Sequence, residues 1–207
     1  MASGKGGSGK TTTTLGLARA LSRRGAPVVA ADADWDLPNL ARLASATAEH
    51  REPDVNAPTV VEAVRSDEPV DPDRHAPTVV SAPDTSDAVD ARRVLGALAE
   101  AIPDEVPALV DCPAGASPDA AAPLRVADRC LIVTPLRRAA LPDAAKTAAL
   151  ARRLDCPPVG TVVVRAASPP AGVADLLGCP VLGQIPSAEP RPLSDSSVRA
   201  AYERLAR

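Results

Sequence analysis

The chain has 207 residues, a length that suits one α/β domain with an ordinary hydrophobic core. Its net charge of -3 argues against a broad electrostatic attraction to DNA or to anionic membranes. Because one Trp and one Tyr are its only aromatic residues, stacking platforms for single-stranded nucleic acid are not expected, and the core must consist mainly of Ala, Val and Leu.

The first dozen residues contain a phosphate-loop pattern, in which Gly4 is followed by four residues and then by Gly9-Lys10-Thr11. Glycines let successive backbone N–H groups turn toward one anion, and Lys10 supplies a positive charge for the outer phosphates. The Thr11 hydroxyl is a suitable ligand for Mg²⁺. The chain has three lysines, and Lys5 and Lys10 both lie in this loop, where a compact ammonium fits among phosphate oxygens. The pattern therefore predicts a nucleotide site rather than a flexible Gly/Ser-rich tail.

The residues before the loop are unusual. A phosphate loop normally follows a buried strand, but only Met1, Ala2 and Ser3 precede Gly4. We therefore expect the phosphate-loop strand to be missing from this chain, and we favour a start codon placed downstream of the true one. Because a missing central strand exposes apolar faces and unpaired backbone groups, we expect the chain as given to be unstable or prone to aggregation.

A helix is predicted over 11–24 from the helical spacing of its leucines and alanines, and its positive end would face the loop. The strand predicted over 27–31 is followed by Asp32, Asp34 and Asp36, at the sheet edge where open parallel sheets bind ligands. Alternate aspartates alone are more often a solvated turn. After a phosphate loop and a strand, we prefer the functional interpretation.

The remaining pattern alternates strands with helices. The strand over 106–110 ends in Asp111, an arrangement in which a carboxylate holds Mg²⁺ or its water, and Gly115 would allow the following loop to move. Further strands are expected over 78–82, 130–134, 160–164 and 181–185, and further helices over 59–64, 88–101, 143–154 and 196–207. This alternation predicts a single α/β domain over 1–207, with a mostly parallel sheet and helices on both faces.

Three motifs carry a family resemblance. Gly4 to Thr12 resembles the deviant Walker A loop of the MinD/ParA family of P-loop ATPases, whose signature is the first lysine, here Lys5. Asp32-Ala-Asp34, with Asn39 after it, resembles the switch I of that family, and Asp111-Cys-Pro-Ala-Gly115 resembles its switch II. The resemblance implies nucleotide contacts from Gly4, Lys5, Gly6, Gly7, Ser8, Gly9, Lys10, Thr11, Thr12 and Gly115, a Mg²⁺ shell of Thr11, Asp32 and Asp111, and catalysis by Lys5, Lys10 and Asp34.

The same resemblance implies an ATP-dependent homodimer that hydrolyses Mg-ATP and positions a protein partner or cargo, in cell division or in chromosome or plasmid partition. In such a dimer Lys5 would reach into the site of the partner subunit, and Asp34 would orient the attacking water. The alternative is a nucleotide-gated binding module with little or no hydrolysis. Val164 and Arg165 stand where many members have an asparagine that reads adenine, so we assign the adenine contacts to the backbone after Pro186.

The cysteines and the apolar runs bear on redox chemistry and location. Because Cys112, Cys130, Cys156 and Cys179 form no C-x-x-C pair, buried reduced thiols are favoured over a zinc ribbon, a redox motif or a metal-cluster carrier. Neither a signal peptide nor a membrane-spanning run is recognised, so we expect a cytoplasmic protein. Residues 196–207 look like a last core helix rather than an amphipathic membrane segment, so direct membrane binding is not expected.

Overall fold

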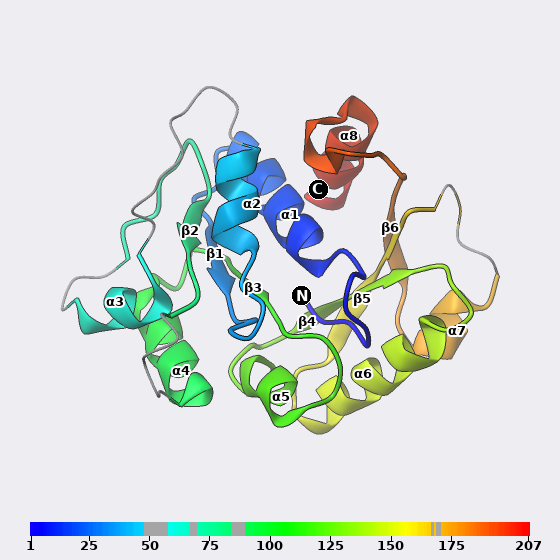
Figure 1. Cartoon of the computed structure of the whole chain (residues 1–207), viewed down its shortest axis with the longest axis horizontal. Coiled ribbons are helices and arrows are strands. Elements are labelled where there is room, and N and C mark those ends of the chain that lie inside the picture. Colours follow the sequence, from blue (N-terminus) through cyan, green and yellow to red (C-terminus); the bar gives the residue numbers. More distant parts are fainter. Residues whose placement is uncertain (48–57, 67–69, 84–89, 167, 169–170) are drawn as a thin grey trace.

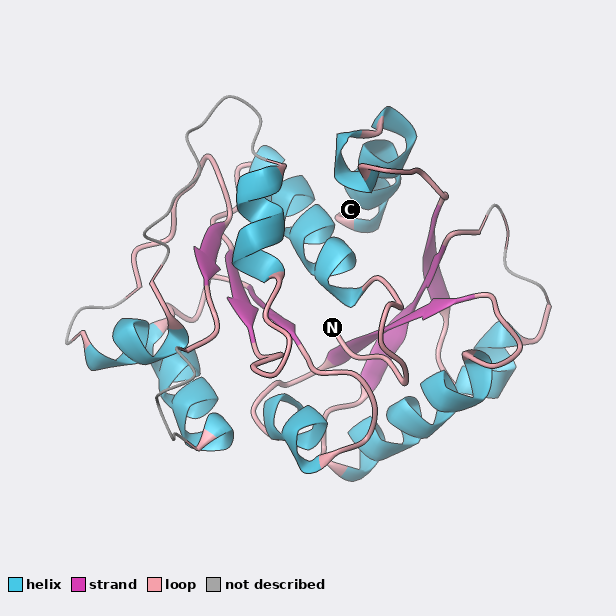
Figure 2. Ribbon diagram, in the orientation of Figure 1, coloured by secondary structure: helices cyan, strands magenta, loops and turns pink. Residues whose placement is uncertain are grey.

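The computed structural model describes residues 1–47, 58–66, 70–83, 90–166, 168 and 171–207. In this part of the chain, strands and helices alternate along the sequence (Figures 1 and 2). The strands are β1 Val29–Asp32, β2 Thr78–Val80, β3 Ala108–Asp111, β4 Cys130–Pro135, β5 Pro158–Val164 and β6 Val181–Ile185. The helices are α1 Lys10–Arg23, α2 Leu40–Ala46, α3 Val60–Arg65, α4 Ala91–Ala101, α5 Pro118–Leu124, α6 Leu141–Arg153, α7 Val173–Leu177 and α8 Ser196–Leu205, with a 3₁₀ turn at Pro192–Ser194 before α8.

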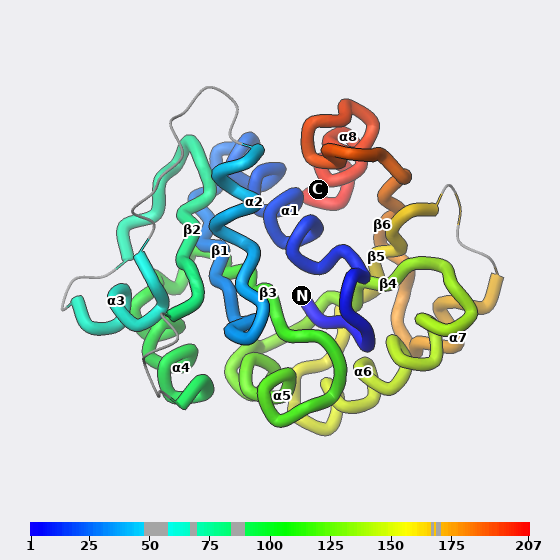
Figure 3. The backbone as a smooth tube through the Cα atoms, viewed as in Figure 1, coloured from blue at the N-terminus to red at the C-terminus, as the bar shows by residue number. Residues whose placement is uncertain are grey.

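The strands form two parallel three-stranded sheets, in the orders β2-β1-β3 and β4-β5-β6. Within the described residues no named strand joins the two sheets, and the first residues of the chain bridge both. The amino group of Met1 donates to the Val110 carbonyl of β3, and the Ala2 N–H donates to the Leu131 carbonyl of β4 at 3.0 Å. The Val133 N–H in turn donates to the Ala2 carbonyl at 2.9 Å. The chain therefore begins in the middle of the molecule, between β3 and β4 (Figure 3).

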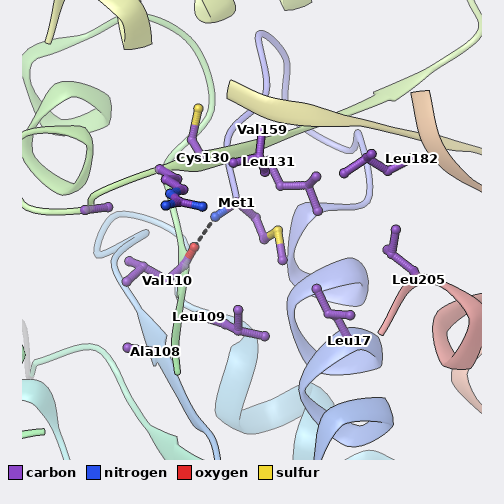
Figure 4. Close-up of a pocket in the computed structure, with 12 residues that line it drawn as sticks. Met1, Leu17, Ala108, Leu109, Val110, Cys130, Leu131, Val159, Leu182 and Leu205 are labelled. Atoms are coloured by element: carbon purple, nitrogen blue, oxygen red, sulfur yellow. Dashed lines mark hydrogen bonds between the residues drawn. The ribbon is translucent and has the colours of Figure 1, made fainter. Parts of the chain in front are cut away.

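An apolar groove of about 270 Å³ continues from Met1 along the facing edges of β3 and β4 (Figure 4). Its walls include Leu17, Leu109, Leu131, Val159, Leu182 and Leu205. Val159 on β5 is 41% exposed and Leu182 on β6 is 47% exposed, which is high for side chains of a parallel sheet that helices cover on both faces. Successive carbonyls of a strand point in opposite directions. The Pro107 and Asp111 carbonyls point toward β1, because they accept hydrogen bonds from residues at its two ends. The Ala108 carbonyl, next to Pro107, therefore points away from β1 and toward β4. The two three-stranded sheets, or half-sheets, therefore face each other beside Met1 with backbone carbonyls directed into the groove.

Helices cover both faces of the sheet, as the sequence predicts. Helices α1, α2 and α8 lie on one face, and α3 to α7 lie on the other (Figures 1 and 2). Along each strand, successive side chains point to opposite faces of the sheet, so one strand contributes to the cores on both faces. Ala30 and Val162 pack in the core that includes α1 and α8, whereas Val29 and Val163 pack in the cores under the opposite helices. Because these side chains are fully buried, the sheet is shielded from solvent on both faces over most of its area.

Close packing between α1 and α8 fixes the helix that follows the phosphate loop. A Cβ built on Gly16 of α1 would lie 2.4 Å from the Tyr202 ring of α8, so only glycine allows this approach. The Tyr202 hydroxyl lies 3.3 Å from the Thr13 hydroxyl, and burial raises the pKa of Tyr202 to about 12. Val198, Ala201 and Tyr202 form the buried face of α8 that the sequence predicts.

The predicted strands are all present, with ends that differ by at most two residues. The helix predicted over 88–101 is observed as α4, and its first residues, 88 and 89, lie outside the described residues. Three short helices, α2, α5 and α7, were not predicted. They have five to seven residues each, so an apolar periodicity has too little length to develop, and α5 also contains an internal proline, Pro123.

Candidate nucleotide and metal site

The phosphate loop connects the bridging residues 1–3 to the first turn of α1, and three of its glycines are required by conformation or by packing. Gly7 and Gly9 have left-handed backbones, with φ of 69° and 91°. A Cβ on Gly4 would lie 2.3 Å from the backbone of Asp143 at the start of α6, so no larger residue fits there. The loop is therefore held closely against α6 while its backbone curls over the start of α1.

Two serines brace the loop from inside. The Ser8 hydroxyl donates to the Ser3 hydroxyl at 2.7 Å, and the Ser3 hydroxyl donates to the Lys5 carbonyl at 3.1 Å. Both serine side chains are buried. The two hydrogen bonds connect the beginning and the end of the loop, and they leave its exposed middle, Lys5 to Gly7, at the surface.

The two loop lysines differ in their surroundings. Lys10 is the first residue of α1 and is only 6% exposed. Its positive charge lowers the pKa of both Asp34 and Asp111, so its ammonium lies near both carboxylates. Lys5 is exposed on the rim of the loop. Lys10 is thus part of the interior of the site, whereas Lys5 is available to a group outside this chain.

Asp111, at the carboxyl end of β3, has the strongest requirement for a cation. Its side chain is buried, and its Oδ1 atom has no hydrogen-bond partner among the described residues. Burial raises the pKa of Asp111 to about 6, although the Thr11 hydroxyl hydrogen bond, the positive amino terminus and Lys10 act in the opposite direction. A buried carboxylate oxygen beside a threonine hydroxyl is a donor set that Mg²⁺ prefers. The residues present therefore fit a magnesium ion.

Among the described residues, no group of three or more His, Cys, Asp or Glu side chains could hold a metal ion. Asp111 is accompanied by a hydroxyl and not by two further carboxylates. This is the usual arrangement for Mg²⁺ that is bound through one or two protein oxygens, several waters and the phosphates of a substrate.

Asp32 organises the segment between β1 and α2. Its Oδ1 accepts a hydrogen bond from the Asp34 N–H, and its Oδ2 accepts from the N–H groups of Asn39 and Leu40, all at 3.0 Å. Burial raises the pKa of Asp32, opposed by these three backbone donors. In this conformation its carboxylate shapes the loop that carries Asp34. Its place in the Mg²⁺ shell stays a prediction.

Asp34 and Gly115 face the site from the two loops that the sequence assigns as switches. Asp34 is half-buried, and burial raises its pKa while Lys10 lowers it. Gly115 has a φ of 94°, and its N–H donates to the Ser3 carbonyl at 3.0 Å. The contact predicted between this N–H and a phosphate therefore requires the hydrogen bond to Ser3 to open.

Two residues of the site were missed by the sequence analysis. Trp35 had no assigned role, and its Nε1 donates to the Asp32 carbonyl at 3.1 Å, which secures the loop between β1 and α2. Arg165 was noted only as a departure from the family pattern, yet its guanidinium donates to the Gly7 carbonyl of the phosphate loop at 2.6 Å. The Arg165 contact has no local sequence signal, because it joins segments that meet only in the folded protein. The Trp35 contact is local, but no sequence motif assigned a partner to the indole.

The cysteines and the helices agree with the sequence analysis. All four cysteines are free and buried, and the Cys130 thiol donates to the Cys156 carbonyl at 3.4 Å. Burial raises the pKa of Cys112. In the part of the chain that the structure describes, every helix is too short or too polar to cross a membrane.

Comparisons with known proteins agree with this geometry. Residues 1–190 match the CobQ/CobB/MinD/ParA nucleotide binding domain family. An uncharacterized ATP-binding protein of Methanocaldococcus jannaschii is 28% identical over 193 residues, which cover 90% of this chain and 72% of that protein. The cell division ATPase MinD of Pyrococcus furiosus is 27% identical and superimposes with a TM-score of 0.76, over 99% of this chain and 94% of that one. The septum site-determining protein MinD of Pyrococcus horikoshii, solved with Mg-ADP, is 22% identical with a TM-score of 0.75, over 99% and 92% of the two chains.

Proposed function

Because the chain belongs to the CobQ/CobB/MinD/ParA nucleotide-binding family, we propose that it is a switch ATPase that binds Mg-ATP, dimerises with ATP bound and hydrolyses it to position a protein partner or cargo. The observation that carries the proposal is the orphaned Oδ1 atom of Asp111. A buried carboxylate oxygen without a partner is costly to the free protein, and this one lies beside Thr11 and Lys10 at the start of α1. A metal–nucleotide complex is the ligand that satisfies all three groups at once.

In this proposal some residues of the site neutralise the charge of the phosphates and others orient the attacking water. The loop N–H groups and the positive end of α1 receive the phosphates, and Lys10 offsets their charge from inside the site. Thr11 and Asp111 would hold Mg²⁺, which when bound neutralises charge on the phosphate oxygens. Asp34 would orient the attacking water, and its raised pKa suits a group that accepts a proton from that water.

Lys5 is the residue that this proposal assigns to the site of the partner subunit. Its side chain is exposed on the rim of the loop, whereas Lys10 already occupies the interior. An exposed ammonium contributes little to the site of its own chain in water, but it would stabilise phosphate charge strongly if a second subunit excluded water from it. The exposure of Lys5 therefore supports a role in the site of the partner subunit.

A nucleotide-gated binding module with little hydrolysis is the second candidate. One observation favours it, since the Gly115 N–H that would contact the γ-phosphate is already paired with the Ser3 carbonyl. If that pair persists with ATP bound, transition-state charge receives one hydrogen bond fewer. A single-turnover measurement with protein in excess over labelled ATP separates the two. Release of phosphate within minutes supports the ATPase, and intact ATP after hours supports the module.

The proposal is tested first by Lys10→Ala, with binding of Mg-ATP and Mg-ADP measured by titration calorimetry. Removing a buried cation from the phosphates is expected to weaken binding by at least about a hundredfold. Lys146→Ala is the matched control, because Lys146 is exposed on α6 and its side chain contacts Asp143 at i,i+3, with 3.4 Å between the two charged groups. Wild-type affinity in Lys10→Ala would overturn the assignment of the nucleotide site.

A further inference from the structure

The end of β5 touches the phosphate loop at two successive residues. A Cβ on Gly9 would lie 3.5 Å from a methyl group of Val164, the last residue of β5, so the strand end supports the loop directly. The next residue, Arg165, extends its guanidinium to the Gly7 carbonyl, and the two atoms are 2.6 Å apart. Both residues are exposed, and a charged donor at this distance makes a stronger hydrogen bond than a neutral donor does.

Arg165 occupies an unfavourable backbone conformation. Its φ of 55° lies in the left-handed region, which residues other than Gly, Asn and Asp adopt rarely. The backbone on both sides is fixed by β6, because Val164 pairs with Ile185 and the Ala166 N–H donates to the Ile185 carbonyl at 3.3 Å. A strained residue held in place by its neighbours is a feature that clusters at functional sites. Here the strained backbone carries the side chain that contacts the phosphate loop.

The contact controls the direction of one peptide group in the loop. The Gly7 carbonyl and the Ser8 N–H belong to the same planar trans peptide, so they point in opposite directions. A guanidinium that holds the Gly7 carbonyl on the outer side therefore turns the Ser8 N–H toward the inner side, where loop N–H groups bind an anion. Glycine at position 7 makes the opposite orientation accessible, and that orientation would aim a carbonyl dipole at the phosphates.

We propose that Arg165 is a positioning residue that fixes the Gly7–Ser8 peptide in the orientation that binds nucleotide phosphates. The inference rests on the proposed function for its ligand, the phosphates of a nucleotide, and on the nucleotide-free structure for its geometry. Arg165 acts through the peptide and not on the reacting atoms. Its loss should therefore raise the KM for Mg-ATP more than it lowers kcat.

Arg165→Gly gives the sharpest test, because it removes the guanidinium and also relieves the left-handed strain. We expect its melting temperature to equal or exceed that of the wild type, while its affinity for Mg-ADP falls about tenfold. Arg165→Lys should recover only part of the affinity, since an ammonium lacks the planar fork. Arg92→Ala, which removes the same charge from an exposed position on α4, is the control and should bind as the wild type does.

Hydrogen exchange of the Ser8 amide in nucleotide-free protein is the second readout, and it does not depend on the ligand. Exchange at Ser8 should be faster in Arg165→Gly than in the wild type and in Arg92→Ala. Equal exchange rates would overturn the positioning role, even if affinity falls, because Arg165 would then contact the nucleotide itself. If the wild type fails to bind Mg-ADP, the proposed function fails, while faster exchange at Ser8 would still support the control of the peptide by Arg165.

Discussion

Replacing Asp111 with asparagine should make the nucleotide-free protein more stable while abolishing magnesium-dependent binding. The carboxylate is buried beside Asp32, and its Oδ1 has no partner within the described part of the chain. Its pKa of about 6 lies roughly two units above the ordinary value of 3.8, which corresponds to about 3 kcal/mol of destabilisation at neutral pH. An unpaired amide in the variant costs on the order of 1 kcal/mol, so about 2 kcal/mol of stabilisation remains. For a chain of this size, that raises the melting temperature by roughly 4–8 °C.

The raised pKa of Asp111 also predicts how the difference in stability between the variant and the wild type changes with pH. Because the pKa of Asp111 is raised in the folded protein, the folded state binds the proton more tightly than the unfolded state does. The penalty is therefore complete above about pH 7, and it is relieved as the pH falls through 6 toward 4. The difference in melting temperature between Asp111→Asn and the wild type should be largest near pH 7.5 and should shrink toward pH 4.5.

The assay is calorimetric melting in buffer with EDTA across this pH range, with Asp104→Asn as the control for loss of one exposed carboxylate. Adding Mg²⁺ and ADP should raise the melting temperature of the wild type and of Asp104→Asn, but it should have little effect on Asp111→Asn. A variant that melts at or below the wild-type temperature at pH 7.5, or a difference that does not change with pH, would refute the reasoning.

Two further predictions concern the scaffold. Gly16→Ala should lower the melting temperature by roughly 4–8 °C, because a Cβ 2.4 Å from the Tyr202 ring forces α1 and α8 apart at a cost of about 2 kcal/mol, and an unchanged or higher value would contradict the packing. Appending Val-Ile-Val before Met1 should raise the melting temperature by several degrees relative to Gly-Ser-Gly at the same place, because the apolar groove beside β3 and β4 can accept a strand. Equal melting temperatures for the two extensions would show that the groove does not bind an extended segment.

The sheet and the long helices were predictable from the sequence because their signals are local. Buried parallel strands appear as short apolar runs, and β6 was predicted with both ends correct. The position of Asp111 at the carboxyl end of β3 was also predicted, while its role as a metal ligand stays a prediction. The alternation of strands and helices also predicted parallel pairing with helices on both faces.

The remaining features depend on loop conformation or on which distant segments meet, and neither has a local sequence pattern. The Asp32 carboxylate accepts from three backbone N–H groups of the loop that follows it, and its predicted place in the Mg²⁺ shell stays a prediction. The contact of Arg165 with Gly7 joins residues that are 158 positions apart. The bridging role of residues 1–3 likewise became visible only when both half-sheets were in place.

The measurement that tests the switch ATPase most directly is the ATPase rate of a mixture of Lys5→Ala and Asp34→Ala, each of which should be nearly inactive alone while still binding ATP. If Lys5 acts across the dimer and Asp34 acts in its own chain, a mixed dimer contains one complete site and one site that lacks both groups. With random pairing, half of the dimers are mixed, so the mixture should recover about a quarter of the wild-type rate. No recovery, in a mixture where differently tagged subunits are shown to pair, would contradict action of Lys5 in the partner subunit.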